Sequence, residues 1–145
     1  MGYAALRLLF FLLIVKPFLL LVVGINVRHR KRLPGTGPAL IVANHNSHLD
    51  ALVLMAMLPL HLLLRTRPAA SAEYFLRNRW RAWFATKVIG IIPLTTAGGR
   101  PHAEVLEPVR QALIRGEIVI FFPEGTRGEP ECLGKLKSGI AWLAE

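Results

Sequence analysis

His45 and Asp50 stand five residues apart in the stretch VANHNSHLDAL, which covers residues 42–52, and Asp50 is the only aspartate in the chain. The histidine comes at the end of an apolar, strand-like run, and the aspartate falls where the following helix should begin. A carboxylate that binds one imidazole nitrogen fixes the tautomer and leaves the other nitrogen as a base. Such a pair can take the proton from a hydroxyl that attacks an acyl carbonyl. The protein itself need not supply that hydroxyl, because a substrate can bring it.

Each of these residues also has a plainer interpretation. Asp50 could serve only to cap its helix, and His45 could be an ordinary turn residue. His48 is a rival base near the same carboxylate, although we expect it to point along the helix surface. The single cysteine, Cys132, is expected to be a small buried or half-buried residue and not a nucleophile. The sequence has no cluster of cysteine and histidine residues that would predict a metal site.

A second polar segment, FFPEGTRG, covers residues 121–128 and follows another apolar run. It combines backbone N–H groups, the hydroxyl of Thr126 and the guanidinium of Arg127, and Gly125 allows close approach of a ligand. That set suits a phosphate group, although it lacks the Gly-Lys-Ser/Thr ending of a P-loop. Glu124 would repel a phosphate, so we expect it to hold Arg127 or the loop. The plain alternative is a turn with a surface ion pair.

The pattern along the chain predicts four strands and four helices around these segments. The strands are expected at residues 39–43, 61–65, 88–94 and 117–122. The first helix is expected to follow a cap at Asn46 or Ser47 and to run to about Met57, and the second to cover residues 74–88. The third carries Leu106 and Val109 on its apolar face and ends at Gly116, and the last begins near Leu133. Strands that alternate with helices indicate an α/β fold, with a largely parallel or mixed sheet and flanking helices. In such sheets the reactive loops lie at the carboxyl ends of the strands. Both polar segments fall at such ends, so we expect them to meet at one edge.

The N-terminal region, residues 3–25, is almost entirely apolar. As one straight helix it would be about 34 Å long, enough to cross a hydrocarbon core of about 30 Å. Lys16-Pro17 falls in its middle, so the sequence is equally compatible with one spanning helix and with a helical hairpin that enters the membrane and turns there. The basic cluster RHRKR at residues 28–32 is typical of a cytoplasmic flank and would bind anionic headgroups.

These observations predict two units, separated by the linker LPGTGP. Residues 1–32 form a membrane anchor with a basic flank, and residues 33–145 form the domain that carries both polar segments. We expect membrane localisation, with this domain on the cytoplasmic face. The net charge of +9 also raises a nucleic-acid partner. Only the aromatic and basic helix at residues 74–88 would support that, and the same helix could contact lipid headgroups, so we expect no nucleic-acid partner.

Together the two polar segments resemble the glycerolipid acyltransferase family, whose bacterial lysophosphatidate acyltransferases carry NHxxxxD and, later, FPEGTR. Here the first motif is Asn44-His45 with Asp50, and the second covers residues 122–127. The resemblance implies a membrane enzyme of phospholipid biosynthesis. It would move a fatty acyl group from acyl-CoA or acyl carrier protein to the free hydroxyl of a lysophospholipid, by default lysophosphatidate to phosphatidate.

The resemblance also implies roles for individual residues. His45 would be the general base and Asp50 its orienting partner. The loop residues would bind the acceptor's phosphate or order the site around it; they are Glu124, Gly125, Thr126 and Arg127. No metal and no cofactor are implied beyond the acyl co-substrate, and the expected partners are membrane lipids, the lysophospholipid and the acyl donor.

Two departures from the family pattern bear on these expectations. The segment GIIPL at residues 90–94 fits the family, but Thr96 stands where the family has an arginine thought to contact the acceptor phosphate. Arg100 is the candidate that could take its place. An acyltransferase for another lysolipid, or a truncated, non-catalytic membrane-associated relative, therefore stays an alternative. Because the family continues with further strands, we expect the catalytic domain to be incomplete at its C-terminus.

Overall fold

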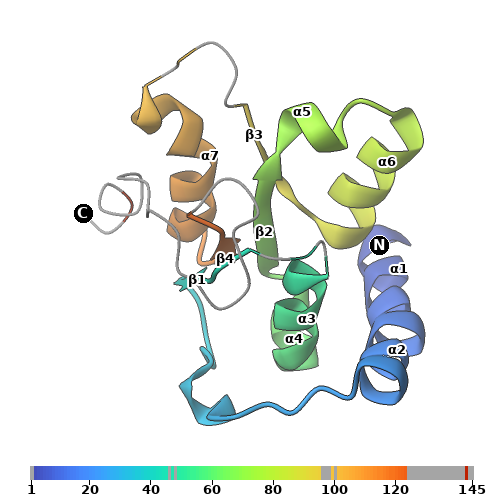
Figure 1. The fold of residues 1–145 in the computed structure, drawn as a ribbon. Helices are drawn as coiled ribbons and strands as arrows, with labels where there is room; N and C mark the ends of the chain where they lie inside the picture. Colours follow the sequence, from blue (N-terminus) through green and yellow to red (C-terminus); the bar gives the residue numbers. More distant parts are fainter. Residues whose placement is uncertain are drawn as a thin grey trace.

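The computed structural model describes residues 2–45, 47, 49–95, 99, 101–123 and 143. Its centre is a sheet of four strands, β1 (Ala39–Val42), β2 (Thr66–Ser71), β3 (Ile92–Leu94) and β4 (Ile118–Phe121), in the order β1-β4-β2-β3 (Figure 1). All three pairings are parallel. The predicted α/β fold is thus confirmed.

Helices cover both faces of the sheet. They are α3 (Asp50–Met57), α4 (Leu60–Leu63), α5 (Ala72–Phe75), α6 (Arg79–Trp83), the π-helical turn η4 (Phe84–Ile89) and α7 (His102–Ile114). Successive residues of a strand point to opposite faces, and β4 shows this clearly. Val119 packs against the α7 side, whereas Ile120 packs with Met55 and Leu63 from α3 and α4 on the other. Figure 1 shows α7 on one side of the strands, with α3, α4 and the N-terminal segment on the other.

The strand predicted at residues 61–65 is wrong. Most of this run forms α4, and the strand begins one residue later, as TRPAAS over Thr66–Ser71. A short apolar run fits a buried helix as well as a strand, and here Leu62 and Leu63 are buried from a helix. The polar start of β2 is accommodated because the buried hydroxyl of Thr66 donates to the carbonyl oxygen of Leu62 at 2.8 Å.

The single helix predicted at residues 74–88 is also wrong. Asn78 interrupts it in an extended conformation, and its side chain accepts hydrogen bonds from the N–H groups of Trp80 at 2.9 Å and Arg81 at 3.4 Å. This cap starts α6 as a new helix. The strand predicted at residues 88–94 is shorter than expected, because Val88 and Ile89 belong to η4.

The strands predicted at residues 39–43 and 117–122 and the helices predicted to end near Met57 and at Gly116 are confirmed, with ends that differ by up to a few residues. The helix predicted from Leu133 lies outside the described residues, apart from Leu143.

Residues 2–23 form one continuous helix, named here the N-terminal helix. It comprises α1 (Gly2–Phe10), the π-helical turn η1 (Phe11–Val15), α2 (Lys16–Phe18) and the π-helical turn η2 (Leu19–Val23), and the short 3₁₀ turn η3 (Arg30–Arg32) follows. By length and composition it could cross a membrane. The chain does not turn at Lys16-Pro17, so the helical hairpin that the sequence left open is wrong and the segment forms a single helix.

One stripe of the N-terminal helix is buried against the domain. It consists of Arg7, Phe11, Val15 and Leu19, four residues apart each time. In an ideal α-helix four residues turn by about 400°, so such a stripe would drift by about 40° at each step. The wider π-helical turns reduce this drift and keep the stripe facing the domain along the whole helix.

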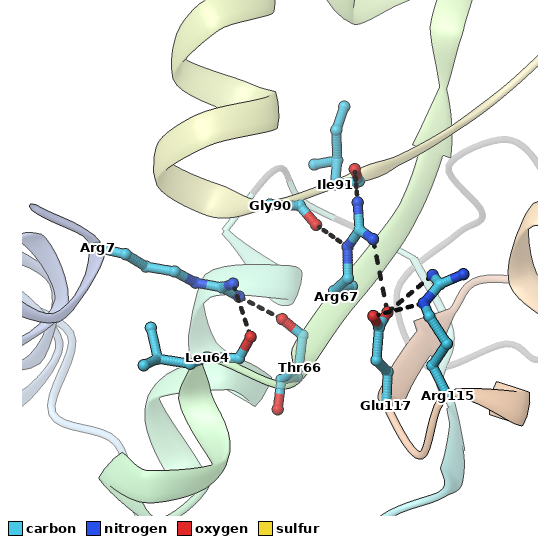
Figure 2. Close-up of polar contacts among 8 residues, drawn as sticks. All are labelled: Arg7, Leu64, Thr66, Arg67, Gly90, Ile91, Arg115 and Glu117. Atoms are coloured by element: carbon cyan, nitrogen blue, oxygen red, sulfur yellow. Dashed lines mark hydrogen bonds and ion pairs between the residues drawn. The ribbon is translucent and has the colours of Figure 1, made fainter. Parts of the chain in front are cut away.

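Arg7 fixes the start of this stripe to the amino-terminal edge of the sheet (Figure 2). Its guanidinium donates to the carbonyl oxygens of Leu64, at 3.4 Å, and Thr66. Beside it, Arg67 donates to the carbonyl oxygens of Gly90 at 2.9 Å and Ile91 at 3.1 Å. The buried cation therefore joins the N-terminal helix to backbone groups that would otherwise need another donor.

Candidate active site

The site lies at the carboxyl edge of the sheet, where β1 ends. The backbone N–H of Ala43 donates to the carbonyl oxygen of Phe121 at 3.2 Å, so pairing with β4 continues one residue beyond β1. His45 follows two residues later. The parallel pairing of β1 with β4 also brings the end of β4 to this edge, and with it the start of the second polar segment.

The structure brings His45 and Asp50 together. The Nδ1 atom of His45 lies 3.3 Å from the Oδ2 atom of Asp50, and the two side chains are 24% and 28% exposed. The nitrogen is shielded from solvent and makes no hydrogen bond with correct geometry to a described residue, so the contact is an ion-pair approach and not an aligned hydrogen bond. Catalytic hydrogen bonds are often poorly aligned without substrate. With Nδ1 directed at the carboxylate, Nε2 is the nitrogen that could act as a base.

The turn between the strand and the helix holds the carboxylate in this position. The backbone N–H of Ser47 donates to Oδ2 of Asp50 at 2.7 Å, and the N–H of Asp50 donates to the carbonyl oxygen of Ser47 at 3.0 Å. The hydroxyl of Ser47 accepts from the N–H of Leu49 at 3.2 Å. These contacts close the turn that precedes α3. The residue before the helix is Leu49, which has no side-chain cap, so Ser47 orders the turn and does not cap the helix as predicted. Asn46, the other predicted cap, lies outside the described residues.

The helix that begins at Asp50 is itself fixed in the core. Met55 of α3 is fully buried in the cluster that contains Phe11 and Ile120. An acidic residue in the first turn of a helix also interacts favourably with the helix dipole. The carboxylate is thus held by a rigid element, while the histidine is held by the strand.

Phe122 is a site residue that sequence reasoning included only as part of a motif. Its ring packs on the His45 ring, with 4.4 Å between centroids and 33° between planes. Phe122 directly precedes Pro123, which is buried at the start of the second polar segment. This contact joins the two polar segments, which are far apart in the sequence, and limits the orientation of the imidazole from one face.

The other predicted site residues lie outside the described residues; they are Arg100, Glu124, Gly125, Thr126 and Arg127. The rival base His48 and the substituted position Thr96 lie outside them as well. Within the part of the chain that the structure describes, no group of three or more His, Cys, Asp or Glu is placed to hold a metal ion.

A cavity of about 230 Å³ lies elsewhere, between the end of the N-terminal helix and α3. Its lining is mostly apolar, and Lys16 and Arg30 contribute the two cations. Neither His45 nor Asp50 lines it, so this cavity is separate from the candidate catalytic pair.

Comparison with known proteins confirms the family resemblance. The family model described as Acyltransferase matches residues 24–145. The chain is 31% identical to the chloroplastic 1-acyl-sn-glycerol-3-phosphate acyltransferase LPAT1 of Arabidopsis thaliana over 121 residues, which is 83% of this chain and 32% of the relative. It is also 31% identical to 1-acyl-sn-glycerol-3-phosphate acyltransferase alpha of Mus musculus over 123 residues, 84% of this chain and 41% of the relative.

The chain therefore spans between about a third and two-fifths of the length of these relatives. No solved structure matches it significantly.

Proposed function

Because this chain belongs to the acyltransferase family, we propose that it transfers a fatty acyl group from acyl-CoA or acyl carrier protein to the free hydroxyl of a lysophospholipid. The observation that carries this proposal is the contact between His45 and Asp50 at the carboxyl edge of the sheet, beside Phe122. The relatives are named for 1-acyl-sn-glycerol-3-phosphate, so the default acceptor is lysophosphatidate and the default product is phosphatidate.

In the proposed reaction, Nε2 of His45 takes the proton from the acceptor hydroxyl as its oxygen attacks the thioester carbonyl carbon. Asp50, 3.3 Å from Nδ1, stabilises the imidazolium that forms. The tetrahedral intermediate then collapses: the carbon–sulfur bond breaks, and the leaving thiolate takes the proton back from His45. The products are the ester and the free thiol, and His45 returns to its neutral state.

The acceptor would be held through its phosphate. We propose that the loop from Glu124 to Arg127 binds this group or orders the site around it, and that Arg100 supplies the charge which Thr96 cannot. Arginine suits this task because its guanidinium forms paired hydrogen bonds with phosphate oxygens. Support for this part comes from the sequence motif and from Phe122, which joins the start of the loop to His45.

We propose that the N-terminal helix holds the domain on the cytoplasmic face of a membrane and lies in the plane of one leaflet. Its buried stripe follows the domain from Arg7 to Leu19, while its outer face exposes leucines along the same length. This helix is apolar on both faces, but only one face packs against the domain. The other face is therefore suited to contact with lipid. The basic cluster at residues 28–32 suits anionic headgroups at the end of the helix.

The function is tested with the full-length protein, a labelled acyl-CoA or acyl carrier protein, and a panel of lysophospholipids that includes lysophosphatidate. His45→Ala should abolish formation of the diacyl product and leave membrane association intact. His61→Ala is the matched control, because it makes the same change at an exposed position of α4 and should transfer at the normal rate. Equal turnover by the His45→Ala variant and the control would refute the proposal.

A further inference from the structure

Large apolar side chains are exposed not only on the N-terminal helix but also on the segment from Tyr74 to Lys87, here called the aromatic-basic surface. Trp80 of α6 is 80% exposed, and Tyr74, Leu76, Trp83 and Phe84 are each more than a third exposed. Tryptophan is usually covered in soluble proteins, whereas Trp and Tyr gather at membrane–water interfaces, where their rings meet both lipid and water. This surface therefore suits an interface between lipid and water.

The same segment carries four basic residues and no acidic one: Arg77, Arg79, Arg81 and Lys87. All four are exposed, and no ion pair joins any of them to an acid among the described residues. The guanidinium of Arg81 lies 5.1 Å from the ring centroid of Tyr74. Cations beside exposed aromatic rings match the boundary between the phosphates and the acyl chains of a bilayer.

This surface continues directly into the N-terminal helix. The rings of Tyr3 and Trp83 pack edge to face with 6.4 Å between centroids, and those of Phe10 and Phe84 with 5.1 Å. Lys87 lies over the ring of Tyr3, 5.5 Å from its centroid. Figure 1 likewise shows α6 beside the N-terminal end of α1. The exposed face of the helix and the aromatic-basic surface are therefore neighbouring parts of one continuous region.

We propose that the aromatic-basic surface is a second membrane-contact site that binds the headgroups of anionic phospholipids. This inference rests on the membrane association proposed above. Basic residues then flank the N-terminal helix at both ends: Arg79 and Arg81 near its start, and the cluster at residues 28–32 beyond its end. A helix that crossed the bilayer would send these two groups to opposite sides. Both groups reach the headgroups of one leaflet only if the helix lies in its plane.

The contact also has a consequence for catalysis. The segment starts at α5, directly after the carboxyl end of β2, which is the same edge of the sheet as His45. Its end, at η4, precedes β3 and lies at the opposite edge, beside the start of the N-terminal helix. Docking the start of this surface on headgroups would therefore bring the edge of His45 toward the membrane, where an acceptor lysolipid resides.

A second copy of the chain fits this surface less well. In a two-fold dimer each patch meets its own equivalent, so the four cations of one copy would face the four of the other. Like charges opposed in this way cost free energy. An anionic bilayer instead presents the complementary charge.

The test places a fluorescent probe on the surface of the full-length protein. The probe is attached to the cysteine of Leu76→Cys in a Cys132→Ser background, which leaves Trp80 and the arginines in place. Ile114→Cys is the matched control, since it is an exposed aliphatic position on α7, across the sheet from the N-terminal helix. Both proteins are bound to phosphatidylcholine vesicles with and without phosphatidylglycerol, each containing a lipid that is spin-labelled at its headgroup.

We expect the emission of the Leu76→Cys probe to be lost in vesicles that contain phosphatidylglycerol, and that of the Ile114→Cys probe to persist. Adding Arg79→Gln and Arg81→Gln should shift the equilibrium from contact toward release by about thirtyfold, since a basic residue near an anionic surface contributes about 1 kcal/mol and a factor of ten about 1.4 kcal/mol. Arg65→Gln with Arg110→Gln removes the same charge from exposed positions outside this surface and should leave the quenching unchanged.

Two outcomes would overturn the proposal. In the first, the Leu76→Cys probe is quenched no more than the Ile114→Cys probe. The surface then does not lie at the headgroups, and it faces water or binds another protein or nucleic acid. In the second, phosphatidylglycerol or the paired arginine substitutions make no difference, which removes the recognition of anionic headgroups. Acyl transfer is measured on the same samples, so contact without transfer would refute the proposed function alone, and transfer without contact would refute this inference alone.

Discussion

Replacing Asp50 with asparagine is the most informative perturbation of the proposed site. The amide oxygen of Asn can still accept the hydrogen bond that the N–H of Ser47 gives to the carboxylate at 2.7 Å, so the start of α3 should persist. What disappears is the negative charge 3.3 Å from Nδ1 of His45. In the proposed mechanism that charge acts mainly when the imidazole becomes positive, which happens as the acceptor hydroxyl loses its proton.

The size of the effect follows from the distance and the exposure. Two unit charges 3.3 Å apart attract by about 1 kcal/mol in bulk water and by about 5 kcal/mol at the effective dielectric constant of about 20 that suits protein sites. The two side chains are 24% and 28% exposed, so a value between these limits, about 2 to 3 kcal/mol, is appropriate. If this attraction is lost from the transition state alone, kcat decreases by roughly 30- to 160-fold.

The assay measures initial rates of transfer from labelled acyl-CoA to lysophosphatidate, over a range of both substrates, in vesicles of fixed composition. We expect kcat to fall while the KM of each substrate changes little, because the carboxylate contacts His45 and not a substrate. Ser47→Ala is the control for a disturbed helix start. It removes the hydroxyl that accepts from Leu49 but leaves the charge, so its kcat should stay within a few-fold of normal.

Two results would refute this reasoning. If Asp50→Asn retained more than about a fifth of the kcat, the charge would contribute about 1 kcal/mol or less, which is the value for exposed pairs. If Ser47→Ala and Asp50→Asn lost activity equally, the geometry of the turn, and not the charge, would be what matters.

Three further predictions concern the residues around the site and the N-terminal helix. Gly90→Ala should lower the free energy of unfolding by about 1–3 kcal/mol in urea titration, because φ is +79° and the new methyl would lie 2.8 Å from Nη1 of Arg7. Gly99→Ala, at φ +63° in open space, controls for the backbone conformation alone. Equal losses in the two variants would exclude the clash with Arg7. Arg7→Met keeps an apolar stem but leaves two carbonyl oxygens without their donor, so the free energy of unfolding should fall by about 1–3 kcal/mol. An unchanged free energy of unfolding would show that other donors replace the guanidinium. Phe122→Leu should lower kcat by roughly two- to thirteenfold with the fold intact, because stacking contributes about 0.5–1.5 kcal/mol. Full activity would show that the ring does not orient His45.

The contact between His45 and Asp50 could be predicted from sequence because its geometry is local. A strand end, a short turn and the first turn of a helix bring residues five apart within contact distance, and the polar residue Ser47 belongs to that turn. The meeting of the two polar segments was predicted for a different reason, since parallel strands share one carboxyl edge. Phe122 could not be assigned its contact, because that depends on the exact register of β1 with β4.

The sequence did not predict β2, because the burial of this strand comes entirely from the elements that pack around it. Arg67 and Pro68 are unusual residues for a central strand. They are tolerated because β4 pairs with the first half of β2 and β3 with the second, so the proline does not need partners on both sides. The hydroxyl of Thr66 and the side chain of Arg67 bond to carbonyl oxygens outside the sheet pairing. None of these contacts leaves a periodic signal in the sequence.

The N-terminal helix shows the opposite case, in which a signal is present but concealed. Arg7, Phe11, Val15 and Leu19 recur every four residues, yet in a segment where nearly every residue is apolar this spacing does not stand out. In the folded chain the stripe covers Met55 and Ile120 in the same core that fixes α3, the helix on which Asp50 sits. Moving the helix away to cross a bilayer would expose this core to water and leave Arg7 without its carbonyl partners. The helix therefore has to remain with the domain, and any membrane that receives its outer leucines holds the carboxyl edge of the sheet at a fixed height above the lipid.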